Sequence, residues 1–243
     1  MKNALIAVVA LACAWAGVAH AAALVDLAVV DRATGERIPA HVHRGRIYVA
    51  GSPGSKYSLV ITNKTGERVL AVTSVDGVNV ITGETASPAQ SGYVLDPWGS
   101  VEISGWRKSM SEVAAFVFTP LPDSYAARTD RPGNVGVIGV AVFREYQVPR
   151  PPAISRKEAP AASSADAESR AAPRDKLGTG HGEREPSYAS WTDFRRASDR
   201  PSELVSVWYD SRENLVARGI LPGRPYAEPN PFPGFRFAPD PRS

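Results

Sequence analysis

The feature that most constrains this chain is a series of short apolar runs between residues 24 and 146, separated by turn residues at roughly ten-residue intervals. The runs are rich in β-branched residues, which is typical of β-strands. They comprise residues 24–30, 46–50, 57–61, 68–73, 93–95, 101–106, 113–119 and 135–143. No amphipathic helix separates them. The pattern therefore predicts a mainly β fold, an antiparallel sandwich of immunoglobulin-like or jelly-roll-like type over residues 22–146.

One turn in this region has a specific signature. Asp76-Gly77 lies between two β-branched runs, and this dipeptide accepts the positive φ angles of a type I′ hairpin turn. The apolar positions of neighbouring runs predict which side chains form the core. These candidates are Val69, Ala71, Val101, Ile103, Phe116 and Phe118.

Residues 1–21 have the features of a secretory signal peptide. Lys2 provides a positive start, residues 4–18 are apolar and uncharged, and small residues precede a cleavage site after Ala21. Cleavage there also removes Cys13, the only cysteine. We expect a periplasmic or extracellular protein without disulfides and without a transmembrane segment once the signal peptide is removed.

The charge pattern argues against a nucleic-acid partner. The formal net charge is only +3, and acidic residues interrupt the lysines and arginines throughout the chain. Nucleic-acid binding usually needs basic residues gathered in a stripe. The sequence also contains no P-loop and no dinucleotide-binding motif in a strand-to-helix context, so it predicts no cofactor.

Residues 147–186 predict a disordered linker rich in Pro, Ala and Ser. The segment has no aromatic residue, and only Val148, Ile154 and Leu177 carry sizeable aliphatic side chains. A segment so poor in apolar groups is not expected to offset the entropy lost on ordering.

After the linker, residues 187–221 predict a small C-terminal unit. Residues 190–197 suit a short helix, and residues 204–209 and 215–221 predict a two-stranded hairpin. Such a hairpin is marginal alone, so we expect the unit to dock on the sandwich or on an envelope protein. Residues 222–243 form a tail of prolines and aromatic residues.

The string Gly178-Thr-Gly-His-Gly-Glu-Arg-Glu185 contains the first candidate site. His181 with Glu183 and Glu185 could bind a ligand or metal, or act as an acid and base, since flanking glycines let a ligand approach the backbone. The alternative is a surface turn in which the carboxylates pair with Arg184.

Two histidines form the candidate metal site. His41 and His43 are two residues apart in a predicted strand, so both imidazoles would project from one face of it. The sequence shows no third ligand nearby. The alternative is a pair of solvated histidines on an edge strand.

The tryptophans provide the remaining candidates for binding. Trp191 and Trp208, with Trp98 and Trp106, could form an aromatic platform for a sugar or a peptide. The alternative is that these rings pack in the core or between units, since each buries a large area.

Four strings carry a resemblance to known sequences. They occupy residues 75–80, 91–95, 105–109 and 177–185. On these strings the chain resembles a group of uncharacterised secreted proteins of Gram-negative bacteria, to which no activity is assigned. The resemblance covers the sandwich and the C-terminal unit. It implies an envelope location and carries over no functional residue.

Together these observations predict a non-catalytic periplasmic or secreted β-sandwich that acts as a binding or envelope-associated module. The alternative is a periplasmic hydrolase or a metal-binding protein that uses His181 or the pair His41 and His43. The chain has no G-x-S-x-G, H-E-x-x-H or S-x-x-K motif, so the common hydrolase signatures do not support this alternative.

Overall fold

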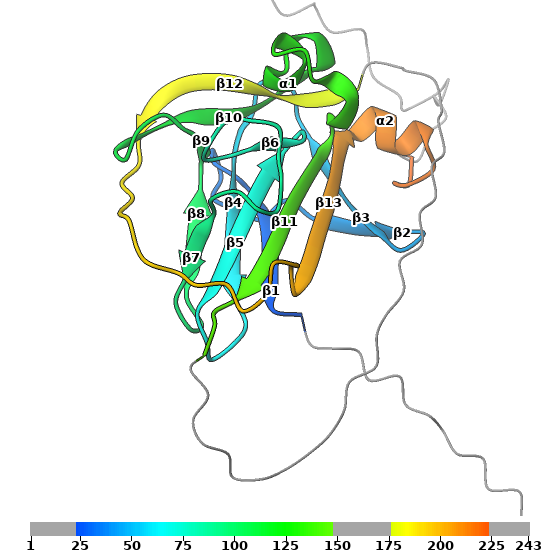
Figure 1. The fold of residues 1–243 in the computed structure, drawn as a ribbon. Helices are drawn as coiled ribbons and strands as arrows, with labels where there is room; N and C mark the ends of the chain where they lie inside the picture. The colour runs from blue at the N-terminus through cyan, green and yellow to red at the C-terminus, as the bar shows by residue number, and fades with distance from the viewer. Residues whose placement is uncertain (1–22, 148–175, 224–243) are drawn as a thin grey trace, which may run out of the picture.

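The computed structural model describes residues 23–147 and 176–223. The described chain is mainly β, and its strands form two sheets packed face to face in a sandwich-like arrangement (Figure 1). This confirms the predicted β class and its layering. The predicted signal peptide, most of the predicted linker and nearly all of the predicted tail lie outside the described residues.

The first sheet has the order β1-β4-β10-β12, with β8 paired to β4 and β9 paired to β10. All its pairs are antiparallel. Its strands are β1 (Val25–Asp31), β4 (Lys56–Asn63), β8 (Ser100–Ile103), β9 (Gly105–Arg107), β10 (Glu112–Pro120) and β12 (Leu177–Pro186).

The second sheet has the order β2-β3-β13-β11-β5-β6, with β7 paired to β5. It is mixed, because β3 and β13 run parallel. Its strands are β2 (Ala40–His43), β3 (Arg46–Gly51), β5 (Val69–Val75), β6 (Val78–Asn79), β7 (Tyr93–Leu95), β11 (Val137–Arg144) and β13 (Glu203–Ser211). Four short helices complete the described chain: η1 (Leu121–Asp123), α1 (Tyr125–Arg128), η2 (Pro132–Asn134) and α2 (Arg212–Ala217).

The core lies between the sheets and is centred on aromatic rings. Tyr57 stacks on Phe118 and Phe116, with ring centroids 4.2 and 5.3 Å apart, and Trp106 meets Phe116 edge-on at 4.8 Å. Five of the six core candidates are buried, and Val101 is half-buried against the same cluster. Alternation along the predicted strands was therefore sufficient to identify the inner faces.

The Asp76-Gly77 turn is confirmed. It is the two-residue loop that joins β5 to β6, and its φ angles are +53° and +73°. Both residues thus adopt the left-handed conformation that a type I′ turn requires.

The predicted linker is wrong for its last ten residues, because residues 177–186 form β12. This strand pairs with β10 along its whole length. Its glycines serve close packing: a Cβ on Gly178 would lie 2.6 Å from Ser124 Cβ, and one on Gly182 would lie 2.8 Å from the carbonyl oxygen of Ala115. The string lacks apolar side chains because β12 is held largely by backbone hydrogen bonds to its neighbour.

The predicted C-terminal unit is also wrong. Residues 203–211 form β13, which lies inside the second sheet between β3 and β11. The predicted boundary after residue 146 therefore does not separate two structural units.

The rest of the predicted unit differs as well. Residues 212–217 form α2 instead of a second hairpin strand. Ser211 caps this helix, because its Oγ accepts a hydrogen bond from the backbone amide of Asn214. Leu215 and Leu221 are buried with Tyr48 on the outer face of the second sheet. No helix forms over residues 190–197, where Arg196 makes a β-bridge with Glu145.

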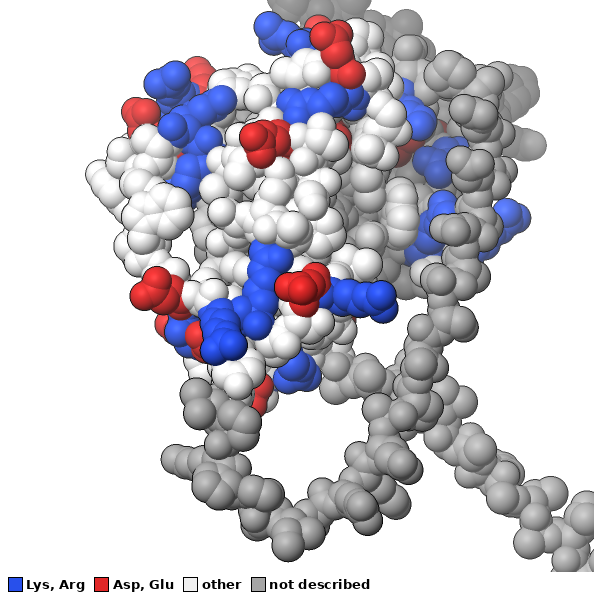
Figure 2. Space-filling view, viewed as in Figure 1, with Lys and Arg blue, Asp and Glu red and all other residues white. Residues whose placement is uncertain are grey.

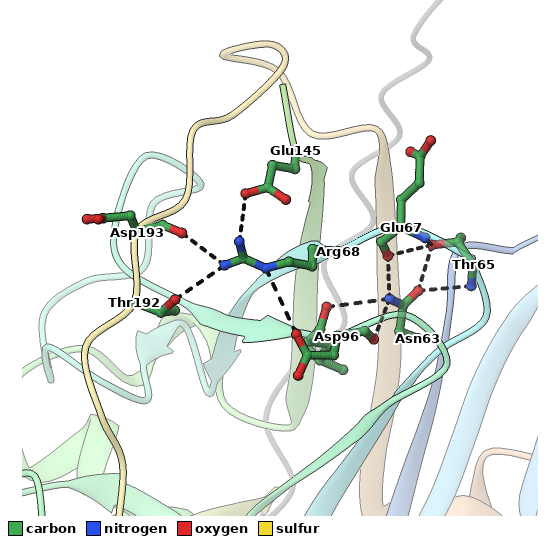
Figure 3. A network of polar contacts seen from close by, with 9 residues as sticks. Asn63, Thr65, Glu67, Arg68, Asp96, Glu145, Thr192 and Asp193 are labelled. Carbon is green, nitrogen blue, oxygen red and sulfur yellow. Dashed lines mark hydrogen bonds and ion pairs between the residues drawn. The ribbon is translucent and has the colours of Figure 1, made fainter. Parts of the chain in front are cut away.

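A polar network fixes the segment that leads into β13 (Figure 3). The Arg68 guanidinium is 3.0 Å from Glu145 Oε1 and donates hydrogen bonds to Thr192 Oγ1 and to the carbonyl oxygen of Asp193. These bonds hold the segment around Thr192 in an extended path beside the start of β5. This explains why the predicted helix over residues 190–197 does not form. No helix in the described ranges, 23–147 and 176–223, is long and apolar enough to cross a membrane.

Candidate functional site

The outer face of the second sheet brings together residues from three strands. His41 of β2 is the cross-strand partner of Tyr48 of β3, and Tyr48 is the partner of Trp208 of β13. Cross-strand partners project from the same face of a sheet. His43 and Arg46 are also partners, so they share this face. His41, Tyr48 and Trp208 are aligned because β3 lies between β2 and β13 in the sheet.

Helix α2 covers part of this face and leaves a pocket beside it. The pocket lies where η2, the start of β11, the end of β13 and α2 meet, and Trp208 and Tyr209 form part of its wall. Its volume is about 490 Å³. This is within the range of about 300 to 1,000 Å³ of small-molecule sites. We call it the Trp208 pocket.

The lining of the Trp208 pocket is basic. Arg46, Lys176 and Arg218 line it, and Asp210 is its single acidic residue. The Arg46 guanidinium lies over the Trp208 ring, with its Cζ 5.1 Å from the ring centroid. Among the described residues neither Arg46 nor Lys176 forms an ion pair. The pocket therefore carries an excess of positive charge.

Asp210 is occupied by structural contacts. Its Oδ1 accepts hydrogen bonds from the backbone amides of Leu177 and Ser211 and from Asn214 Nδ2 at 2.8 Å. Arg218 NH1 is 3.3 Å from its other oxygen. This carboxylate fixes the ends of β12 and β13 to α2, and it offsets only one of the three basic side chains.

A buried hydrogen-bond network lies behind the pocket wall. The hydroxyls of Tyr57 and Thr179 are 2.6 Å apart, and those of Thr179 and Tyr209 are also 2.6 Å apart. Tyr209 donates to Asp76 Oδ1, and the backbone amides of Gly136 and Thr179 donate to the same carboxyl. The network ties both sheets to the Asp76-Gly77 turn.

The environment of Asp76 changes its acidity. Its side chain is almost fully buried, and burial raises its pKa from 3.8 to about 6, although the hydrogen bonds from Tyr209, Gly136 and Thr179 act to lower it. Burial also raises the pKa of Tyr57 and Tyr209 well above 10, and the charge of Asp76 adds to both effects. We therefore expect the Asp76 carboxyl, with its raised pKa, to change its charge in mildly acidic solution.

The structure separates the three residues of the first candidate site. His181 contacts the rings of Tyr125 and Trp106. Glu183 and Glu185 instead pair with Lys56 at 3.2 and 2.8 Å, and Glu185 also pairs with Arg32. Within residues 23–147 and 176–223 no ion pair joins His181 to either glutamate. The predicted alternative of pairing with Arg184 does not occur either, because Arg184 faces Glu112 at 3.7 Å.

Contacts with basic residues also set the acidity of Glu185. Burial alone would raise its pKa, but the hydrogen bonds from Lys56 and Arg32 outweigh burial and lower the pKa. Glu185 is therefore ionised near neutral pH and is held as part of a salt-bridge cluster. It is not positioned to exchange a proton with His181.

The four candidate tryptophans do not form one platform. Trp106 is in the core, Trp208 is half-buried at the pocket, and Trp98 and Trp191 are 67% and 83% exposed at other places. Trp191 lies in the segment before β13 and precedes Thr192 in the chain. Of the predicted binding tryptophans, only Trp208 lines the candidate pocket.

The predicted metal pair shares a face of β2, as its spacing implied, and both side chains are half-buried. In the described part of the chain no group of three His, Cys, Asp or Glu side chains could hold a metal ion. Metal binding by His41 and His43 thus stays a prediction, and the structure supplies no third ligand for it.

Sequence reasoning missed the basic residues of the pocket. Arg46 is the first residue of β3, Lys176 precedes β12 and Arg218 follows α2. They are far apart in the chain and share no local motif, so only the tertiary arrangement brings them together. Comparison of the chain with protein-family models, with curated proteins and with solved structures finds no match.

Proposed function

We propose that this protein is a non-catalytic, periplasmic or secreted β-sandwich, of immunoglobulin-like or jelly-roll-like type, that binds an anionic ligand in the Trp208 pocket. One observation carries the proposal. A pocket of about 490 Å³ combines an aromatic wall with three basic side chains and one acidic side chain that is already occupied. Charge-assisted hydrogen bonds from arginine are strong and directional toward carboxylates and phosphates.

The secreted location rests on separate support. Residues 1–21 read as a signal peptide, and the chain resembles secreted proteins of Gram-negative bacteria. N-terminal sequencing of the protein recovered from a periplasmic extract tests this part of the proposal. A mature protein that begins at Ala22 supports it, and a chain that keeps Met1 contradicts it.

Calorimetric titration with D-glucuronate, and with glucose as the uncharged match, tests the binding function. We expect glucuronate to bind and glucose to bind at least about tenfold more weakly, because the basic side chains interact with the carboxylate. Arg46→Gln should reduce glucuronate affinity about tenfold, since one charged donor is lost. Equal binding of both sugars, or binding of neither with no response to inorganic phosphate, would contradict an anion site.

Matched variants separate the pocket from the general surface. Arg37→Gln removes an exposed arginine that pairs with Asp26 away from the pocket, and it should leave the affinity unchanged. Trp208→Ala should weaken binding, whereas Trp191→Ala should not, because the Trp191 ring is far more exposed and does not line the pocket.

An envelope protein as partner also stays part of the proposal. Since β13 and α2 belong to the sandwich, the part of residues 187–221 left for such a contact is the segment before β13, where Tyr188 and Trp191 are 86% and 83% exposed. A pull-down from envelope extracts with the native chain and with Trp191→Ala tests it. Recovery of the same proteins by both chains would contradict a contact through this segment.

The hydrolase alternative has less support. It requires a carboxylate that orients His181, and the described glutamates nearest in sequence pair with Lys56 and Arg32. His181→Gln should therefore leave any hydrolase activity of the purified protein unchanged.

A further inference from the structure

A second hollow lies at the edge of the first sheet, where α1 packs against β12. Its volume is about 240 Å³, and Tyr125, Arg128, Thr129 and His181 line it. The His181 ring lies 5.6 Å from the Tyr125 ring, and it is parallel to the buried Trp106 ring at 6.4 Å. Two aromatic rings thus position the imidazole, while its side chain stays exposed.

Basic side chains from three parts of the chain surround this hollow. Arg128 comes from α1, and Arg184 comes from β12. Lys108 follows β9, and its Nζ lies 5.7 Å from the centroid of the Tyr125 ring. Among the described residues Lys108 and Arg128 form no ion pair, and the carboxylate nearest to Arg184 is that of Glu112 at 3.7 Å. Basic side chains are visible over this end of the sandwich, with acidic ones beside them (Figure 2).

A β-bulge in β12 separates the charges of this strand. Phe116 pairs with His181 and Ala114 pairs with Arg184, so two residues of β12 lie opposite the single Ala115. The extra residue reverses the alternation of side chains. His181 and Arg184 therefore share one face, and Glu183 and Glu185 project from the other, where they pair with Lys56.

The electrostatics agree with this geometry. Burial lowers the pKa of His181, and the charges of Lys108, Arg184 and Arg128 lower it further. Burial and the charge of Arg184 likewise lower the pKa of Lys108. Like charges thus repel one another at this edge, and no carboxylate of the described chain faces His181. An anion bound between these basic side chains would reduce their mutual repulsion.

We propose that the hollow formed by Tyr125, Arg128 and His181, with Lys108 and Arg184 beside it, is a second binding site, specific for a phosphate or sulfate group. The ammonium of Lys108, which lies over the Tyr125 ring, and the guanidinium of Arg128 form no ion pair in the described chain and can donate hydrogen bonds to an anion. The His181 imidazole supplies a further donor when it is protonated. The exposed side of Tyr125 can contact the remainder of a ligand that carries this group.

Nuclear magnetic resonance titration of His181 tests the proposal, with the imidazole signal assigned by His181→Gln. Sulfate is the probe, because it does not change charge between pH 4.5 and 8, and sodium chloride of equal ionic strength is the reference. We expect sulfate to raise the pKa of His181 by about half a unit or more, since an anion stabilises the protonated ring. The same pKa in both salts would overturn the proposal.

Lysine and arginine variants locate the effect. Lys108→Gln and Arg128→Gln should each reduce the sulfate-induced shift by at least about half, because each removes one charge beside the ring. Lys56→Gln is the matched control, since it removes the same charge from the opposite face of β12 and should leave the shift unchanged. An equal reduction by Lys56→Gln would show a general charge effect and overturn the site.

Two further measurements set this site apart. Arg46→Gln, which alters the Trp208 pocket, should leave the sulfate shift at His181 intact, so either site can fail without the other. Titration with glucose 6-phosphate, against glucose, followed at the His181 imidazole signal, identifies the source of the group. Tighter binding of the ester than of inorganic phosphate supports an esterified ligand. A larger response of the His181 signal to inorganic phosphate supports the free ion, and a response of this signal to glucose itself overturns anion specificity.

Discussion

Asp76→Asn tests whether one buried carboxyl controls how stability depends on pH. The pKa of Asp76 is 3.8 in its ordinary state and about 6 in the folded protein. Between these values the folded protein keeps the proton and the unfolded chain has lost it. The contribution of Asp76 is therefore fully present below about pH 4 and is lost as the pH rises through about 6.

The size of the effect follows from the same pair of values. The pKa rises by about two units, and each unit is worth about 1.4 kcal/mol, so the contribution is about 3 kcal/mol. The side chain is only 1% exposed, so solvent screens the effect little. Asparagine has nearly the same size and does not titrate, and the variant should therefore lack this part of the pH dependence.

The assay is urea unfolding followed by tryptophan fluorescence, at several pH values from 3.5 to 7. The free energy of unfolding of the native chain minus that of Asp76→Asn should fall by about 2 to 3 kcal/mol over this range. Asp26→Asn is the control, since Asp26 is an exposed carboxylate that pairs with Arg37. A difference between native chain and Asp76→Asn that does not change with pH would refute the reasoning.

Three further results are expected. Tyr209→Phe removes a hydrogen bond to the Asp76 carboxylate, so the pKa of Asp76 should rise further. In the same urea assay, the fall in unfolding free energy with rising pH should then extend above pH 6. Gly77→Ala should lower the unfolding free energy by about 2 kcal/mol and Gly45→Ala by only about 1 kcal/mol. Both glycines have positive φ, but only a Cβ on Gly77 would meet the Asn134 side chain, at 2.8 Å. Equal losses in denaturant unfolding would contradict this contact. Deletion of residues 203–223 removes β13 from the interior of the second sheet, and thermal circular dichroism should then show no cooperative transition. A cooperative transition would mean that the rest of the chain, β12 included, folds without β13.

The sequence alone was sufficient for the strands and for one turn. Regular alternation identified the β class, the layered architecture and nearly all of the proposed core, since alternation depends only on which face of a strand is buried. Asp76-Gly77 predicted its own turn, because the required φ angles restrict the residues that can occupy it. These are local properties, determined by residues that are neighbours in the chain.

Only the tertiary structure decided the roles of residues 177–223. The string around His181 looked like a loop because glycine favours loops, yet here the glycines allow α1 and β10 to approach β12 closely. The run at residues 204–209 suggested a separate hairpin, but its strand pairs with β3 and β11. Pairing between distant segments leaves no periodic signal within either segment. For the same physical reason the basic residues of both proposed sites, which the fold gathers from separate strands and helices, could not be grouped from the sequence.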